Sequence, residues 1–156
     1  MSMTDSVILV HGIWAHGVTM VMMKYRLQKE YGFDVHLFNY PSVKGTLDEN
    51  ARRLSGFIRD LGLDETHVIG HSLGGRMCAW ASRKFMSCGR RVPLIIIVDA
   101  NLLQPIPPNV DKCLNLYVTN KIGIFHGSPV KPECPGTPIV NWDVSQGQPP
   151  WYAGGV

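Results

Sequence analysis

The sequence predicts an α/β fold in which a mainly parallel sheet carries helices on both faces. Short apolar runs alternate with longer segments of helical periodicity along the 156 residues, which is typical of strand–helix–strand units. The apolar run at 94–98 favours a central strand buried on both faces. Glycine-containing turns follow two other apolar runs, at 11–12 and at 70–75. A chain of this length and 45% hydrophobic content predicts one domain, residues 1–156.

The first strand is predicted at residues 6–10, and the first helix at 18–31, ending at Gly32. The apolar face of this helix is predicted to comprise Val18, Val21, Met22 and Tyr25. Three methionines of the helix are expected to pack in the core rather than to line an acyl pocket: Met20, Met22 and Met23.

A buried strand at 34–39 precedes the second predicted helix. Thr46 and Glu49 have the spacing of a capping box, in which the threonine hydroxyl and the glutamate carboxylate bond each other's backbone amides. The helix is expected to end at Gly62. Its predicted apolar face comprises Leu47, Ala51, Leu54, Ile58 and Leu61.

The second half of the chain continues the alternation of strands and helices. A strand at 66–69 is followed by a helix from Leu73 to about Phe85. Three strands are then predicted, at 94–98, 113–119 and 138–143, with proline-rich loops between them. In such a sheet the side chains that carry chemistry are expected at the carboxyl ends of the strands.

The segment Gly70-His71-Ser72-Leu73-Gly74 has the G-x-S-x-G pattern of a nucleophile elbow, placed between a predicted strand and a predicted helix. A serine on so sharp a turn is exposed, and side chains two positions away on either side would collide. Glycine at both positions avoids the collision. The turn also directs the backbone N–H of Leu73 and the helix N-terminus to the place where an anionic intermediate would form. The pattern therefore predicts that Ser72 is a nucleophile.

A second motif, His11-Gly12-Ile13-Trp14, follows the first strand. With this motif and the G-x-S-x-G pattern, the chain resembles the α/β-hydrolase family, and most of all its small bacterial lipase- or thioesterase-like members. The run from His11 to Arg76, with Tyr40-Pro41-Ser42 in the middle, carries the likeness to these members. The resemblance is good over about the first two-thirds of the chain and weaker afterwards. It implies that backbone amides of Ile13, or alternatively Trp14, and of Leu73 stabilise the oxyanion.

Family members often insert a helical lid after the strand that follows the elbow helix. Only the short segment 99–112 fills that place here, which predicts a lidless fold with an open site. The final helix that normally closes the fold is also expected to be missing, because the sequence stops with the loop-like segment 151–156. The domain is therefore expected to be incomplete at its C-terminus.

A serine nucleophile needs a histidine base and an acid that orients the histidine. Asp99 follows the strand at 94–98, where some family members place the acid, and is the preferred candidate. Asp143, at the end of the last predicted strand, is the alternative. The noncatalytic alternative for either residue is a carboxylate that only caps a turn, which is common for aspartate at the end of a strand.

The histidine departs from the family pattern, which implies the chain order serine, acid, histidine. No histidine follows Asp143. His126 is the only histidine after Asp99, so either it is the base or the base lies beyond Val156. The other histidines are expected to serve structural roles or to break the chain order: His11, His16, His36, His67 and His71.

Two functions from different classes fit these motifs. The first is a serine hydrolase that acts on a carboxylic ester or thioester through an acyl-enzyme at Ser72. The second is a noncatalytic binding protein of the same fold with an incomplete triad. The intact elbow and oxyanion turn favour the hydrolase, because a binding pocket needs neither. A small acyl compound is the expected substrate, with no cofactor and no metal.

The composition excludes several other classes. The formal net charge is +3, and the basic pairs at 52–53, 83–84 and 90–91 have no aromatic residues between them, so no nucleic-acid partner is expected. The first residues lack the pattern of a secretion signal, and no apolar run approaches the length of a membrane span.

The four cysteines indicate a cytoplasmic protein. They are Cys78, Cys88, Cys113 and Cys134, and no two form a C-x-x-C pair. We therefore expect reduced thiols, with a disulfide or a metal site as the alternative.

Overall fold

The structure, a computed structural model, describes residues 5–13, 18–119 and 126–149. Within these ranges the strands are β1 (Ser6–Val10), β2 (Asp34–Phe38), β3 (His67–His71), β4 (Ile95–Val98), β5 (Cys113–Tyr117) and β6 (Ile139–Asp143). The helices are α1 (Val18–Tyr31), α2 (Leu47–Asp60) and α3 (Leu73–Ser87), with a short 3-10 helix, η1 (Val144–Gln146). The predicted order of elements is confirmed.

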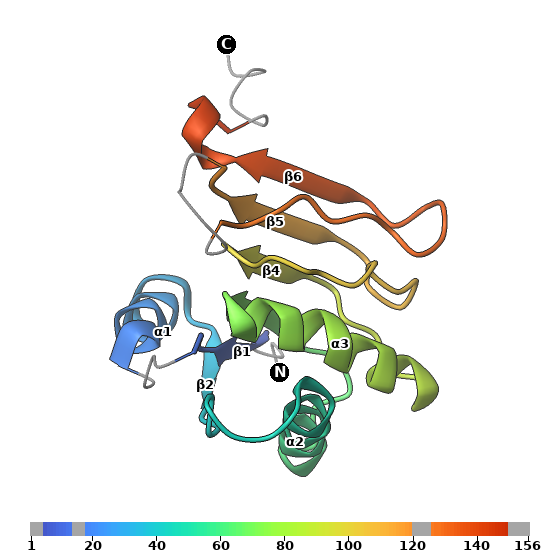
Figure 1. Ribbon diagram of the computed structural model, residues 1–156. Coiled ribbons are helices and arrows are strands. Elements are labelled where there is room, and N and C mark those ends of the chain that lie inside the picture. The colour runs from blue at the N-terminus through green and yellow to red at the C-terminus, as the bar shows by residue number, and fades with distance from the viewer. Residues whose placement is uncertain (1–4, 14–17, 120–125, 150–156) are drawn as a thin grey trace.

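The strands form one parallel sheet with the order β2-β1-β3-β4-β5-β6 (Figure 1). The chain passes from β1 outward to β2 and then returns to the other side of β1 with β3. The direction of winding therefore reverses between β1 and β3. In parallel sheets a crevice opens at the carboxyl ends of the strands at such a reversal, and ligands bind there. This topology places the loops after β1 and β3 next to each other.

Helices α2 and α3 cover one face of the sheet and pack against each other (Figure 1). The side chains of this core are fully or almost fully buried, among them Ile8, Leu54, Met77, Ile95 and Ile97. The capping box of α2 is confirmed, since the Thr46 hydroxyl accepts a hydrogen bond from the Glu49 amide, and the Glu49 carboxylate accepts one from the Thr46 amide. Leu61 caps the end of α2 and is 37% exposed, so it lies outside the buried face.

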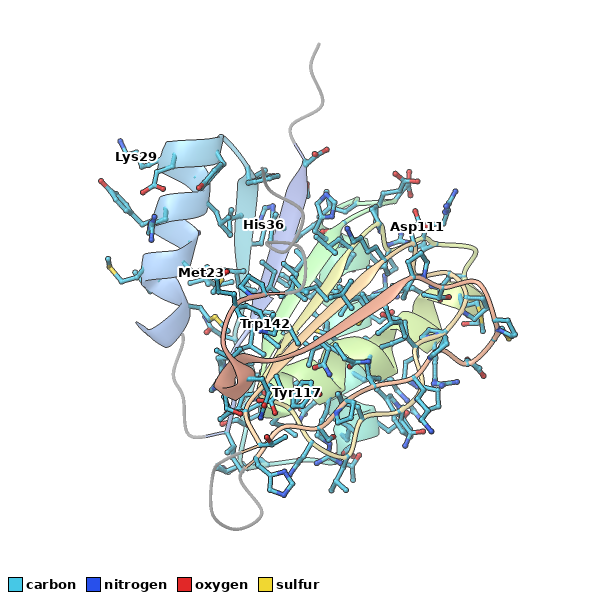
Figure 2. The ribbon with its side chains drawn as sticks, turned by 90° about the horizontal axis from the view of Figure 1, so that it is seen from above. Met23, Lys29, His36, Asp111, Tyr117 and Trp142 are labelled. Atoms are coloured by element: carbon cyan, nitrogen blue, oxygen red, sulfur yellow. The ribbon has the colours of Figure 1, made fainter. Side chains whose placement is uncertain are left out.

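Helix α1 covers the other face, against β1 and β2, and its predicted orientation was wrong. Val21, Met22 and Tyr25 are exposed, whereas Met20 and Met23 pack against the sheet. Figure 2 shows Met23 on the side of α1 that faces the strands and Lys29 on the outer side. Apolar residues occur on both sides of this helix, so periodicity alone could not select the buried one. The exposed Met22 departs from its predicted core position.

The carboxyl-terminal half of the sheet is covered unequally. Ile95 and Ile97 of β4 are fully buried against α3, but Ile96 and Val98 on the opposite face are only half-buried. The expectation that β4 is buried on both faces was therefore only half right. The reason is that α1, the helix on that face, packs over β1 and β2 and does not extend across β5 and β6.

The connection between β4 and β5 contains no helix. It runs through residues 99–112 as bends and isolated bridges, in agreement with the prediction of a fold without a lid. In the described ranges, no helix combines the length and the apolar character that crossing a membrane would require.

Candidate active site

Ser72 occupies the turn between β3 and α3 in a conformation that L-residues rarely adopt. Its φ is 53° and its ψ is −119°. It stands at the N-cap position of α3, yet its hydroxyl forms no capping hydrogen bond. Thr46 at the start of α2 behaves differently, with φ −82° and a hydroxyl engaged in capping. The Ser72 hydroxyl therefore serves no capping role, and its backbone is strained.

The sharp turn exists because the glycines on either side of Ser72 have no side chains. A Cβ on Gly70 would lie 2.5 Å from the carbonyl oxygen of Gly74. A Cβ on Gly74 would lie 2.3 Å from the carbonyl oxygen of Val10. Both distances are too short for any side chain, so the close approach of α3 to β1 and β3 requires glycine at these two positions.

The turn after β1 lies against Ser72. A Cβ built on Gly12 would be 3.1 Å from the Cβ of Ser72. The preceding His11 is buried, its ring stacks on Tyr40 with centroids 4.5 Å apart, and the Tyr40 hydroxyl donates to the His11 carbonyl at 2.8 Å. Burial raises the pKa of Tyr40, so the phenol stays protonated as this donor. His11 therefore holds the turn in place, and Ile13 follows it at the edge of the pocket.

Asp99 directly follows β4, beside the turn that carries Ser72. The Ser72 amide donates to the Val98 carbonyl at 2.8 Å, which joins the two strand ends. Asp99 also has a positive φ, 52°, and its amide donates to the Leu116 carbonyl at 2.7 Å. One carboxylate oxygen of Asp99 accepts the amide hydrogen of Gly127 at 3.1 Å. Asp99 thus ties the loop that carries His126 to the strand end beside the serine.

The loop at 126–128 is fixed by close packing. A Cβ on Gly127 would lie 2.5 Å from the Cβ of Tyr117, and the Ser128 amide donates to the Ala100 carbonyl at 3.1 Å. The His126 side chain is exposed, and its Nδ1 lies 3.1 Å from the Gly127 carbonyl oxygen. Among the described residues, no hydrogen bond connects the Ser72 hydroxyl with a histidine ring.

These elements surround a pocket of about 750 Å³. Ser72, Asp99 and Leu102 are the non-glycine residues with positive φ in the described ranges, and all three line this pocket. Backbone strain of this kind concentrates at functional sites. The remaining lining residues are Ile13, His71, Leu73, Arg76, Asn101, His126 and Ser128.

The preferred site residues all line this pocket: Ser72, Asp99, His126, Ile13 and Leu73. Sequence reasoning missed Arg76 and Leu102, which line the same pocket. The position of Arg76, one helical turn after the serine, was the available signal. Trp14 and His16 lie outside the described residues.

The alternative acid, Asp143, lies elsewhere, at the end of β6. Its carboxylate caps η1 by accepting from the amide and hydroxyl of Ser145, and it also accepts from the Thr119 hydroxyl. The hydrogen bonds from Ser145 and then Thr119 lower the pKa of Asp143 to about 2. Asp143 therefore performs a local structural task.

Two other strand histidines, His36 and His67, do not line the pocket, whereas His71, at the carboxyl end of β3, does. His36 Nε2 lies 2.9 Å from a carboxylate oxygen of Asp34 on the same strand. His67 is at the amino end of β3, opposite the end that carries Ser72, and packs edge-on against Phe33. Neither ring is near the serine.

All four cysteines are free thiols. Burial raises the pKa of Cys113 to about 12 and raises that of Cys78 further, so both are inert neutral groups in the core. Among the described residues, no group of three histidine, cysteine or carboxylate side chains is arranged to bind a metal ion.

Solved structures of several hydrolases share this fold. An extracellular alpha/beta-hydrolase from a Paenibacillus species is 21% identical, with a TM-score of 0.56 over 65% of this chain and 43% of its own. A monoacylglycerol lipase from Paleococcus ferrophilus is 22% identical, with a TM-score of 0.52 over 65% and 42%. The type II thioesterase from the borrelidin biosynthetic cluster is 13% identical, with a TM-score of 0.59 over 74% and 71%. At these identities the likeness concerns the fold.

The matched part of the chain spans less than half the length of the first two of these structures. A search of curated proteins finds no match. The sequence profile of the alpha/beta hydrolase family, in contrast, matches residues 7–153, which is almost the whole chain. The chain therefore belongs to the alpha/beta hydrolase family.

Proposed function

We propose that this protein is a serine hydrolase that cleaves a carboxylic ester or thioester through an acyl-enzyme at Ser72. The observation that carries the proposal is the Ser72 hydroxyl, which has no capping role, on a strained backbone in a 750 Å³ pocket. Strain at a residue without a structural task is expected where function requires it. The hydrolase, lipase and thioesterase structures of the same fold support the choice of reaction class by analogy.

In the proposed reaction the Ser72 oxygen attacks the carbonyl carbon of the substrate, and a histidine accepts the hydroxyl proton. The leaving alcohol or thiol receives that proton as the carbon–oxygen or carbon–sulfur bond breaks. Water then attacks the acyl-enzyme, releasing the carboxylic acid and restoring the serine. We assign the base to His126 and the acid to Asp99, which anchors the His126 loop through Gly127.

The tetrahedral intermediate carries a negative charge on the former carbonyl oxygen. We assign its stabilisation to the backbone amides of Leu73 and Ile13. Leu73 is the first residue of α3, and the first amides of a helix have no intrahelical acceptor. Ile13 follows the turn that packs against Ser72. Donors of this kind supply a large part of the rate enhancement in acyl transfer.

Labelling with a fluorophosphonate tests the nucleophile. The probe is expected to modify Ser72, as located by mass spectrometry of the peptides, and the label is expected to disappear in Ser72→Ala. Ser128→Ala is the matched control, because this serine lines the same pocket and its loss should leave labelling unchanged. Labelling that persists in Ser72→Ala would contradict the proposal.

A noncatalytic binding protein is the second candidate. One observation favours it: among the described residues, no histidine is hydrogen-bonded to the Ser72 hydroxyl. Labelling also separates the two candidates, because without a base the serine should react no faster than an ordinary surface serine. If labelling is rapid in the parent protein and lost in His126→Ala, the hydrolase proposal and the assignment of the base are both supported.

We also infer that the protein works in the cytoplasm, because four free thiols suit a reducing compartment. Cell fractionation tests this inference, and recovery of the protein from the medium or from a compartment that forms disulfides would contradict it.

A further inference from the structure

We propose that Arg76 binds an anionic group of the substrate, so that the preferred esters or thioesters carry a carboxylate or a phosphate close to the scissile bond. This inference rests on the proposed function, because it assigns the substrate class of the hydrolase.

Arg76 lies one helical turn after the proposed nucleophile. It is the fourth residue of α3, and its amide donates to the Ser72 carbonyl at 3.3 Å. Long side chains on a helix lean toward the helix N-terminus, which in α3 is the end that carries Ser72. Arg76 accordingly lines the same pocket as Ser72. A group bound to its side chain would lie beside the bond to be cleaved.

Among the described residues Arg76 has no hydrogen-bond or ion-pair partner for its side chain, unlike the other arginines. Its Nε is inaccessible to solvent and forms no hydrogen bond, and in the described ranges the residue takes part in no ion pair. Five other arginines donate to carboxylates, namely Arg26, Arg52, Arg59, Arg83 and Arg91. The remaining two, Arg53 and Arg90, donate to carbonyl oxygens.

A half-buried guanidinium without a partner destabilises the folded state. Burial removes water from its N–H donors and its charge, and no protein group takes the place of that water. Asp99, on the same pocket, forms no ion pair with Arg76, and it accepts from Gly127. A bound carboxylate or phosphate would satisfy the guanidinium, whose planar set of donors matches paired anionic oxygens. Arg76 thus places a positive charge at the pocket, and the anionic group of a bound ligand would neutralise it.

The test compares phosphonate probes that differ in one charge. Each is an alkyl p-nitrophenyl phosphonate, and Ser72 displaces p-nitrophenolate as its oxygen bonds to phosphorus and its proton passes to the base. One probe carries a carboxylate at the end of the alkyl chain, and the other carries the methyl ester of that group. A second pair carries the carboxylate or its methyl ester on the leaving group instead, which distinguishes an acyl-side anion from an alcohol-side anion.

The parent protein is expected to react about tenfold or more faster with the charged member of one pair, the gain expected for a hydrogen bond to a charged group. Arg76→Gln should lose this preference, whereas Arg76→Lys should keep part of it because the charge remains. Lys29→Gln is the matched control, since it removes one positive charge from the exposed outer side of α1 (Figure 2). It should keep the full preference. Equal rates in both pairs, or a preference that survives Arg76→Gln, would overturn the proposal.

A binding measurement separates this proposal from the hydrolase proposal. Monomethyl adipate, with one carboxylate, is titrated by calorimetry against Ser72→Ala, which cannot form an acyl-enzyme at this position, with and without Arg76→Gln, and dimethyl adipate is the uncharged control. Binding of the monoester that weakens about tenfold in Arg76→Gln supports the anion site even if no probe labels Ser72, in which case only the hydrolase proposal fails. Labelling of Ser72 without charge preference and without Arg76-dependent binding leaves the hydrolase proposal standing and overturns the anion site.

Discussion

Two hydroxyls at the starts of helices show how position decides the role of a residue. Thr46 has ordinary extended backbone angles, and its hydroxyl satisfies an amide of α2. Ser72 has a positive φ, which turns its side chain away from the helix amides, and its hydroxyl caps nothing. The difference arises from the glycines around Ser72, because they let the chain turn more sharply than side chains would allow.

The acid assignment can be tested at Asp99 with two substitutions. Asp99→Asn keeps an oxygen that can accept from the Gly127 amide but removes the charge, so the fold should persist while turnover of an activated ester falls by about three to four orders of magnitude. Asp99→Ala should lose both turnover and the anchor of the loop. Asp143→Asn serves as the control and should retain turnover, because that carboxylate caps η1. If Asp143→Asn were inactive and Asp99→Asn were active, the acid that orients the base would be Asp143.

Two glycine-to-alanine substitutions are expected to change the free energy of unfolding in opposite directions. Gly74→Ala would place a Cβ 2.3 Å from the Val10 carbonyl oxygen, and relief of this clash should cost about 1–3 kcal/mol of unfolding free energy or more. Gly56→Ala in α2 has 3.8 Å to its nearest neighbour and should stabilise the fold by roughly 0.5–1 kcal/mol. Urea unfolding monitored by circular dichroism measures both changes. A neutral Gly74→Ala would mean that the turn can open.

At the scale of elements, Asp48 joins α2 to α3. Its carboxylate accepts from Lys84 at 2.7 Å and from the Trp80 indole at 3.0 Å, both of which lie on α3. The hydrogen bond from Lys84, then that from Trp80, lowers the pKa of Asp48 to about 2. The ionised carboxylate is therefore favoured in the folded state, so its stabilising contribution depends on pH.

The sign of this dependence follows from the lowered pKa. The contribution of Asp48 is present above the unfolded pKa of about 4 and is lost as the pH falls toward 2. Asp48→Asn should therefore have a lower Tm than the parent protein at pH 7, and the difference should shrink as the pH falls from 5 to 2. Asp60→Asn is the control, since the Asp60 side chain is 70% exposed and, within the described ranges, bonds only its neighbour Arg59. A Tm difference that does not change with pH would contradict the role of the charge.

At the scale of the whole molecule, the two faces of the sheet are covered by different helices over different strands. Helices α2 and α3 bury the side chains of β1, β3 and β4 that face them, whereas α1 covers the opposite face only over β1 and β2. The pocket lies at the carboxyl edge of the sheet, where loops from both halves of the chain meet. The site therefore lies at the ends of strands whose side chains α2 and α3 bury on one face.

Truncation of core residues should reveal this asymmetry. Ile97→Ala removes a fully buried side chain of β4 and should cost about 2–5 kcal/mol. Leu116→Ala on β5 removes a half-buried side chain on the other face and should cost less than half as much, because less apolar area leaves contact with the protein. Equal losses in urea unfolding would show that the face of Leu116 is covered as tightly as that of Ile97.

The sequence by itself determined the order of strands and helices, the capping box and the turn at Ser72. These features depend on neighbours within a few positions along the chain, so periodicity and turn chemistry record them. The resemblance carried by the turns at His11 and Ser72 pointed to the family that the profile match shows.

Only the tertiary structure decided which side chains converge. The strand order sets Asp99 beside Ser72 and Asp143 two strands further along the sheet, although both follow predicted strands. The packing of α1 against the sheet placed Met20 and Met23 in the core and left Val21 and Met22 exposed. The position of Arg76 one helical turn after Ser72 can be read from the sequence, but only the tertiary structure shows that its Nε has no hydrogen-bond partner among the described residues. Such contacts join residues far apart in the chain, and no local pattern encodes them.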